Sequence, residues 1–170
     1  MALVVFLRGV NVGGHKKFKP SELVGALADL DLENIGAAGT FVVRGSANAK
    51  DVRERIARSL PFEAEMMVCP AREIVELVRS EPFGRLAAGV KPFVSVLSEP
   101  LRTRPRLPLE RPAGKPWEVR VIKVTGRYVL SLCRPGRAGV YPNEVVERDL
   151  GATATTRAWS TIVTICSRLL

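Results

Sequence analysis

The sequence predicts an α+β protein, and two patterns in the first seventy residues indicate its arrangement. Short apolar runs typical of buried strands alternate with segments whose apolar residues recur at helical spacing. Two of the expected strands, near Asn34-Ile35-Gly36 and over Thr40–Arg44, are separated only by a tight turn near Gly39. The resulting order, β-α-β-β-α-β, is that of a ferredoxin-like fold. We expect this subdomain over residues 1–90 and a second, smaller α/β subdomain over residues 91–170.

The other elements of the first subdomain follow from local signals. Leu3–Leu7 is apolar throughout and predicts a buried strand. Ser21 is a suitable N-cap for a helix over Ser21–Leu30, and Asn48 is a suitable N-cap for a second helix. A further strand and a third helix complete the subdomain, over Ala64–Cys69 and from Pro70 onward.

The second subdomain has a less regular pattern. The expected elements are a strand over Pro92–Ser98, a hairpin of Trp117–Lys123 and Arg127–Cys133 around Thr125-Gly126, and a short helix over Asn143–Leu150 that ends at Gly151. A last helix closes the fold, with Trp159 near its start and Thr155 or Thr156 as its N-cap.

The net charge of +9 is concentrated in one segment. Residues 101–140 hold ten Lys and Arg but only two Asp and Glu, whereas residues 1–100 hold thirteen and twelve. Within Pro100–Pro116, five prolines and four arginines exclude a regular helix and predict an extended arm. Arginine suits phosphate geometry, and the hairpin would present cations beside Trp117 and Tyr128. One alternative function is therefore nonspecific nucleic-acid binding through residues 101–140; the structural alternative is a solvated loop.

The sharpest functional signal is the loop after the first strand, which runs from Gly9 to Lys17. A strand, a Gly-rich turn, cations and a helix start, in that order, are the layout of an anion-binding loop. The P-loop pattern itself is absent, because His15 stands where that pattern has Lys and no Ser or Thr follows. The alternative is that the glycines only allow the chain to turn. The expected ligands of a phosphate or carboxylate are the backbone N–H groups of Gly13 and Gly14 and the side chains of Arg8, Lys16 and Lys17.

A second candidate site lies at the expected start of the last helix. An arginine in a first helical turn opposes the helix dipole, so Arg157 should have a specific partner, either an internal carboxylate or a bound anion. We expect the Arg8–Gly14 loop and the Thr155–Trp159 turn to lie close together. If they meet, Asn11, Arg157 and free backbone N–H groups would line one pocket, and Thr156 is a further expected ligand-binding residue. An enzyme that uses Arg8, Asn11 and Arg157 is the remaining alternative.

Composition restricts the class of protein. With 46% hydrophobic and 25% charged residues, the chain has the composition of a folded globular protein. Its apolar runs are too short to span a bilayer, and no basic segment precedes the first of them, so we expect a cytoplasmic protein without a membrane partner. The cysteines Cys69, Cys133 and Cys166 are far apart, and no Cys or His pair has zinc-ligand spacing. We therefore expect no metal and no cofactor.

Several motifs together resemble a known family. They are Arg8–Gly14, Gly39–Val43, Glu81-Pro82-Phe83, Asn143-Glu144 with Glu147 and Leu150-Gly151, and Ala154–Trp159. These motifs are similar to signatures of DUF1697, a mainly bacterial family of unknown function. The chain departs from that family at Thr40, Ala158 and Ser160, where Asn is usual, and in the Pro/Arg arm, where a helix is usual. The resemblance implies a cytosolic, two-part α+β fold and no particular reaction.

From the sequence we therefore favour a binding module for a small anionic or phosphorylated ligand. The sequence does not decide whether the protein also has an enzymatic activity.

Overall fold

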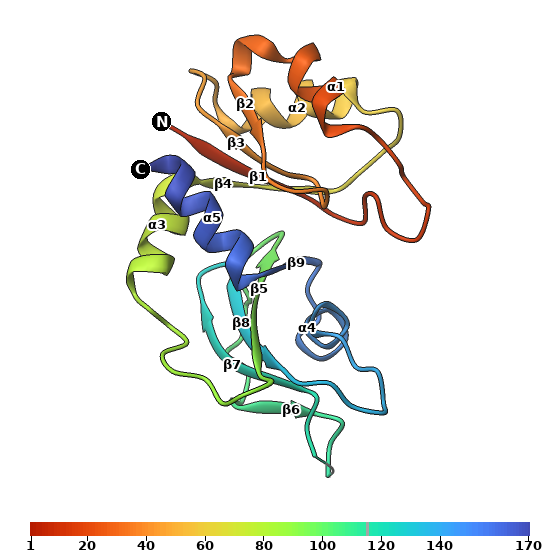
Figure 1. Cartoon of the computed structure of the whole chain (residues 1–170), viewed down its shortest axis with the longest axis vertical. Helices are drawn as coiled ribbons and strands as arrows, with labels where there is room; N and C mark the ends of the chain where they lie inside the picture. Colours follow the sequence, from red (N-terminus) through yellow and green to blue (C-terminus); the bar gives the residue numbers. More distant parts are fainter. Residues whose placement is uncertain (115) are drawn as a thin grey trace. The chain divides into compact units, whose positions relative to one another are not determined.

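The computed structural model describes residues 1–114 and 116–170, and it confirms the α+β class, with two antiparallel sheets (Figure 1). The chain divides into two compact units. The first unit consists of Met1–Glu81 together with Val163–Leu170, and the second unit consists of Pro82–Ile162. The expected domain boundary near residue 90 stays a prediction.

The first unit has the predicted order of elements. These are β1 (Leu3–Leu7), α1 (Pro20–Ala26), a 3-10 helix η1 (Ala28–Leu30), β2 (Leu32–Asn34), β3 (Thr40–Val43), α2 (Ala49–Ser59), β4 (Met66–Pro70) and α3 (Ala71–Arg79). The sheet order is β2-β3-β1-β4, and every neighbouring pair is antiparallel. This is the ferredoxin-like arrangement, with α1 and α2 on the same side of the sheet (Figure 1).

The core of the first unit lies between the sheet and these two helices. Leu3, Val5 and Leu7 of the interior strand β1 belong to one buried cluster with Phe41 and Ile56. Removal of this apolar surface from water is the main force that holds the helices on the sheet. The predicted cap of α2 is also present, since the Asn48 side-chain oxygen accepts a hydrogen bond of 2.9 Å from the Asp51 N–H.

The helix predicted over Ser21–Leu30 is shorter than expected. It begins at Pro20, whose fixed φ suits the first helical position, and Ser21 is not the N-cap. The α-helix ends at Ala26, and a 3-10 turn continues the chain to Leu30. The predicted apolar face is still buried, because the short 3-10 turn keeps Leu30 in the core.

The second unit is built on a five-stranded sheet. Its elements are β5 (Lys91–Leu97), β6 (Leu109–Arg111), β7 (Val119–Thr125), β8 (Tyr128–Cys133), α4 (Pro142–Leu150), β9 (Ala154–Ala158) and the start of α5 (Trp159–Leu169). The order is β6-β7-β8-β5-β9. The predicted hairpin, with Gly126 at φ +56°, and the predicted end of α4 at the left-handed Gly151 are both confirmed. Val145 and Val146 of α4 pack on the sheet.

Two predictions for this unit were wrong in part. The stretch expected to cap and begin the last helix is the edge strand β9, which pairs antiparallel with β5, so Thr155 and Thr156 are not caps. β-branched residues favour a strand once a partner strand is available, and the helix begins only at Trp159. The Pro/Arg arm forms no α-helix in its described residues, as expected, but Leu109–Arg111 pairs with β7.

Candidate functional site

The glycines of the predicted anion loop form the tip of a tight hairpin. Val12 and His15 pair as a β-bridge, and the His15 N–H donates a hydrogen bond of 2.9 Å to the Val12 carbonyl. Gly13 and Gly14 between them have φ values of +56° and +81°, as the two central residues of a type I′ turn require. Helix α1 starts only at Pro20, so the two glycines do not lie at its first turn. Anion binding by their N–H groups stays a prediction.

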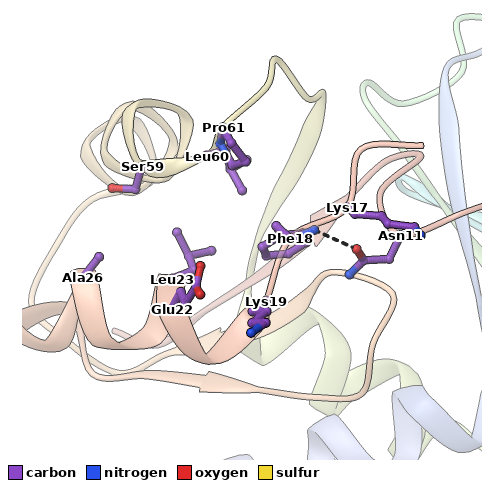
Figure 2. Close-up of a pocket in the computed structure, with 10 residues that line it drawn as sticks. All are labelled: Asn11, Lys17, Phe18, Lys19, Glu22, Leu23, Ala26, Ser59, Leu60 and Pro61. Atoms are coloured by element: carbon purple, nitrogen blue, oxygen red, sulfur yellow. Dashed lines mark hydrogen bonds between the residues drawn. The ribbon is translucent and has the colours of Figure 1, made fainter. Parts of the chain in front are cut away.

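Asn11 holds the base of this loop. Its φ of +53° is left-handed, a conformation that Asn tolerates better than most residues. The side-chain oxygen accepts a 3.0 Å hydrogen bond from the Phe18 N–H (Figure 2), and the side-chain nitrogen donates one of 3.0 Å to the Ala37 carbonyl. The amide therefore fixes where the chain leaves the loop and enters the segment before α1.

The cations of the loop have different surroundings. Arg8 forms an ion pair of 3.6 Å with the exposed Glu65, a contact of small energetic value in water. Lys16 and Lys17 are exposed. The Lys17 side chain lies against the hairpin tip, since its Cε is 3.7 Å from where a Cβ on Gly14 would be. Of the predicted ligands in this loop, only Asn11 and Lys17 line the pocket that the structure shows beside it.

This pocket has a volume of about 840 Å³, which is the size of small-molecule sites. It lies between the segment before α1, α1 itself and the end of α2 (Figure 2). Asn11, Lys17 and Lys19 are at one end, and Ala26 and Ser59 are at the other (Figure 2). The lining residues are Asn11, Lys17, Phe18, Lys19, Glu22, Leu23, Ala26, Ser59, Leu60 and Pro61.

The pocket combines an apolar wall with charged groups at its rim. Phe18 is anchored by ring contacts, with centroids 6.0 Å from Phe62 and 6.4 Å from Phe41. Within residues 1–114 and 116–170, neither Lys17 nor Lys19 forms an ion pair with a protein carboxylate. The charged groups of the lining are two lysines and one carboxylate, Glu22, so the pocket has a net positive charge. An anion with an apolar body would meet this positive charge and an apolar surface from which it displaces water.

The predicted second site is arranged differently from expectation. Thr156 and Arg157 are neighbours in β9, so their side chains point to opposite faces of the sheet. The Thr156 hydroxyl lies 2.6 Å from the Ser95 hydroxyl and donates a 2.8 Å hydrogen bond to the side-chain oxygen of Asn143. These bonds connect β5, β9 and α4, so Thr156 is held within the fold of the second unit.

Arg157 lies in a strand, so the predicted conflict with a helix dipole does not arise. Its Nη1 donates to the Thr155 hydroxyl at 2.7 Å and to the Thr156 carbonyl at 3.1 Å. The side chain is buried, and burial lowers the pKa of Arg157 to about 10, which leaves the guanidinium charged at neutral pH. Arg157 belongs to the second unit and Asn11 to the first, and their shared pocket stays a prediction.

The basic hairpin places cations beside an aromatic ring, as expected, but the ring is covered. The guanidinium carbons of Arg120 and Arg134 lie 4.3 and 4.0 Å from the centroid of Trp117, which is only 9% exposed. Tyr128 is 5% exposed. Neither ring offers the open face that stacking with a nucleic-acid base requires.

Residues from the motifs of the sequence signature contact one another within each unit. In the first unit, Gly39 packs against Val10 of the loop, since a Cβ on Gly39 would lie 2.6 Å from Val10 Cγ2. In the second unit, Phe83 meets Trp159 edge-on, with ring centroids 5.0 Å apart. The signature residues therefore hold loops against the ends of strands. This structural role accounts for much of the sequence signature.

The fold and the pocket define an α+β protein with a ferredoxin-like unit that carries an amphipathic, ligand-sized pocket beside α1. The chain belongs to the family described as protein of unknown function (DUF1697), whose model matches residues 1–126. The matched segment includes the loop and the pocket, whereas the motifs around Asn143 and Ala154–Trp159 follow it. No curated protein and no solved structure matches the chain.

Two further observations concern the described residues, 1–114 and 116–170. They contain no group of three or more His, Cys, Asp or Glu side chains placed to hold a metal ion. Among them, no helix has the length and apolar character needed to cross a bilayer.

The reactivity of the Cys133 thiol tests whether this side chain is as buried as the structure shows. Burial raises the pKa of this thiol from 9.0 to about 12, so its thiolate fraction at pH 8 falls about 10³-fold. We expect iodoacetamide to label Cys133 about 10³-fold more slowly in the native protein than in urea, as measured by mass spectrometry. Equal rates would contradict the burial.

The raised pKa of Cys133 also predicts a dependence of stability on pH. The free energy of unfolding should fall as the pH rises from 9 toward 12, because in this range the thiol ionises only in the unfolded protein.

Proposed function

We propose that this protein binds a small organic anion with an apolar body, and that the ligand occupies the pocket between the Gly-rich loop, α1 and the end of α2. One observation carries the proposal. A pocket of about 840 Å³ combines an apolar wall with two lysines that have no carboxylate partner among the described residues. A carboxylate or a phosphate monoester provides the negative charge, and an aryl or branched alkyl group provides the body.

The position of each group supports this class of ligand. Phe18, Leu23 and Leu60 offer apolar surface whose burial contributes roughly 25 cal/mol per Å². Lys17 and Lys19 lie at one end of the pocket (Figure 2), where their ammonium groups provide positive charge for a carboxylate or a phosphate. An inorganic anion would use only the lysines, so the apolar wall favours an organic ligand.

The enzymatic alternative has less support. The two polar groups of the Asn11 amide are engaged in holding the loop, and Arg8 is paired with Glu65. A binding role needs only the charges and the wall of the pocket.

The proposal includes a cytoplasmic location, where small organic anions are abundant.

The test is a thermal-shift titration with 3-phenylpropanoate and phenyl phosphate. Each should raise the melting temperature of the wild type, because a ligand that binds only the folded state stabilises it. The double variant Lys17→Ala/Lys19→Ala should bind about 10- to 100-fold more weakly, a loss of about 1.4–2.8 kcal/mol, because each exposed lysine contributes about 1 kcal/mol to the binding of an anion.

The matched control is Lys50→Ala/Arg72→Ala, which also removes two exposed cations from the first unit but none from the pocket. It should keep wild-type affinity. Equal losses in the two double variants, or equal affinity for the neutral 3-phenylpropanamide, would contradict the proposal.

A further inference from the structure

We propose that the second unit carries a separate surface that binds the phosphate backbone of double-stranded nucleic acid. Its centre is formed by Arg102, Arg104 and Arg106 of the Pro/Arg arm, together with Lys123 of β7. This function is independent of the small-anion pocket, which lies in the first unit.

The acidic residues of this segment do not offset its positive surface charge. Residues 101–140 contain two carboxylates, Glu110 and Glu118. Glu118 is buried and accepts hydrogen bonds of 3.0 and 3.1 Å from the N–H groups of Ala138 and Val140. Glu110 accepts a 2.7 Å bond from Arg120. Both negative charges are thus engaged inside the unit.

Eight of the nine cations that the structure describes in this segment fall into two groups, and Arg127, which has interactions of its own, belongs to neither. Arg111 and Arg120 are held by Asp149 and Glu110, and Arg134 lies over Trp117. The second group is exposed and forms no ion pair within the described residues: Arg102, Arg104, Arg106, Lys123 and Arg137. A partner can therefore approach this second group without breaking an internal ion pair.

The exposed cations also have a spacing that suits a nucleic-acid strand. Residues 101–108 form neither helix nor strand, and their arginines occupy alternate positions. A chain from Arg102 to Arg106 spans at most about 14 Å, the length occupied by about four phosphates at 3.4 Å each. Arg104 and Lys123 line the same groove of about 500 Å³, so the β7 lysine extends this row.

Two observations favour a duplex over other polyanions. Proteins that bind single strands stack bases on open aromatic rings, but Trp117 and Tyr128, the two aromatic residues of the segment 101–140, are buried, and the exposed Tyr141 lies outside that segment. An anionic membrane would be favoured by large exposed apolar side chains among the cations, but Leu101 and Leu107 of the arm are half-buried. The planar guanidinium groups match phosphate oxygens in a bidentate geometry.

The test measures fluorescence anisotropy with a labelled 20-bp duplex of mixed sequence and with its single strand, at 50 and 200 mM salt. Four phosphate contacts give a slope of about −3.6 in log affinity against log salt, which is a loss of about 10²-fold over this range. The variant Arg102→Gln/Arg104→Gln/Arg106→Gln should lower the affinity at 50 mM salt by at least tenfold and reduce the slope by about 3.

The matched control removes three exposed arginines from the first unit, Arg58→Gln/Arg72→Gln/Arg79→Gln, and has the same net charge. It should bind the duplex like the wild type. Four outcomes would overturn the proposal: absence of duplex binding at 50 mM salt, equal losses in the two triple variants, tighter binding of the single strand, or tighter Arg-dependent binding to phosphatidylserine vesicles than to the duplex.

Discussion

Replacement of Gly39 by Ala is expected to destabilise the protein by about 2–5 kcal/mol. Gly39 has a φ of +82°, and a left-handed conformation costs an L-residue about 1–2 kcal/mol. A Cβ at this position would also lie 2.6 Å from Val10 Cγ2 and 2.7 Å from Leu7 Cβ, and overpacking of this kind costs about 1–3 kcal/mol. Urea denaturation of the purified variant measures the sum.

Gly36→Ala is the matched control for this prediction. Gly36 also has a positive φ, +74°, but a Cβ on it meets no atom within 4 Å. The control should therefore lose only the conformational part, about 1–2 kcal/mol. If both variants lose the same stability, Gly39 is needed for its backbone conformation alone, and the close packing of the Gly39 turn on the start of the loop is not energetically important.

The second large effect is expected for Glu118→Ala, with a loss of about 2–4 kcal/mol. The buried carboxylate accepts hydrogen bonds from the part-buried N–H groups of Ala138 and Val140, and a hydrogen bond to a charged group contributes about 1.5–3 kcal/mol, or less where the donor is partly open to water. Glu118→Gln retains one acceptor oxygen and should lose less. Both values come from urea denaturation.

Glu144→Ala serves as the control, because among residues 1–114 and 116–170 the charged partner of Glu144 is Arg148, in an exposed ion pair. It should change stability by less than about 0.5 kcal/mol. A Glu118→Ala variant as stable as this control would mean that the loop around Ala138 does not depend on the buried carboxylate.

The order of elements could be predicted because several local signals agree with the final fold. Leu3–Leu7 is apolar because it becomes an interior strand with both faces buried, and Asn48 and Gly151 mark helix ends through local hydrogen bonding and backbone conformation. Such signals act over a few residues, so one sequence contains them.

The start of the last helix could not be predicted, since its structure depends on a distant strand. Thr155 and Thr156 suit a helix cap as well as a strand. The choice is made by pairing with β5, which sets Ser95 opposite Thr156. The prediction that Arg157 lies in a first helical turn and opposes the helix dipole was wrong for the same reason.

Only one side of the pocket could be predicted from the sequence. Asn11 and Lys17 belong to a loop with a recognisable glycine and cation pattern, and both line the pocket. Leu60 and Pro61 form its other wall, and they are brought there by the packing of α2 against the sheet. Nothing in their local sequence distinguishes them from an ordinary helix end.

The central claim is that a small organic anion occupies this pocket, and its most direct test locates the ligand residue by residue. In a ¹H–¹⁵N correlation spectrum titrated with 3-phenylpropanoate, we predict the largest saturable shifts at the amides of Lys17, Leu23 and Leu60. The same titration of Lys17→Ala/Lys19→Ala should need about 10- to 100-fold more ligand. Saturable shifts that are largest in the second unit, or no saturable shift at Lys17, Leu23 and Leu60, would contradict the claim.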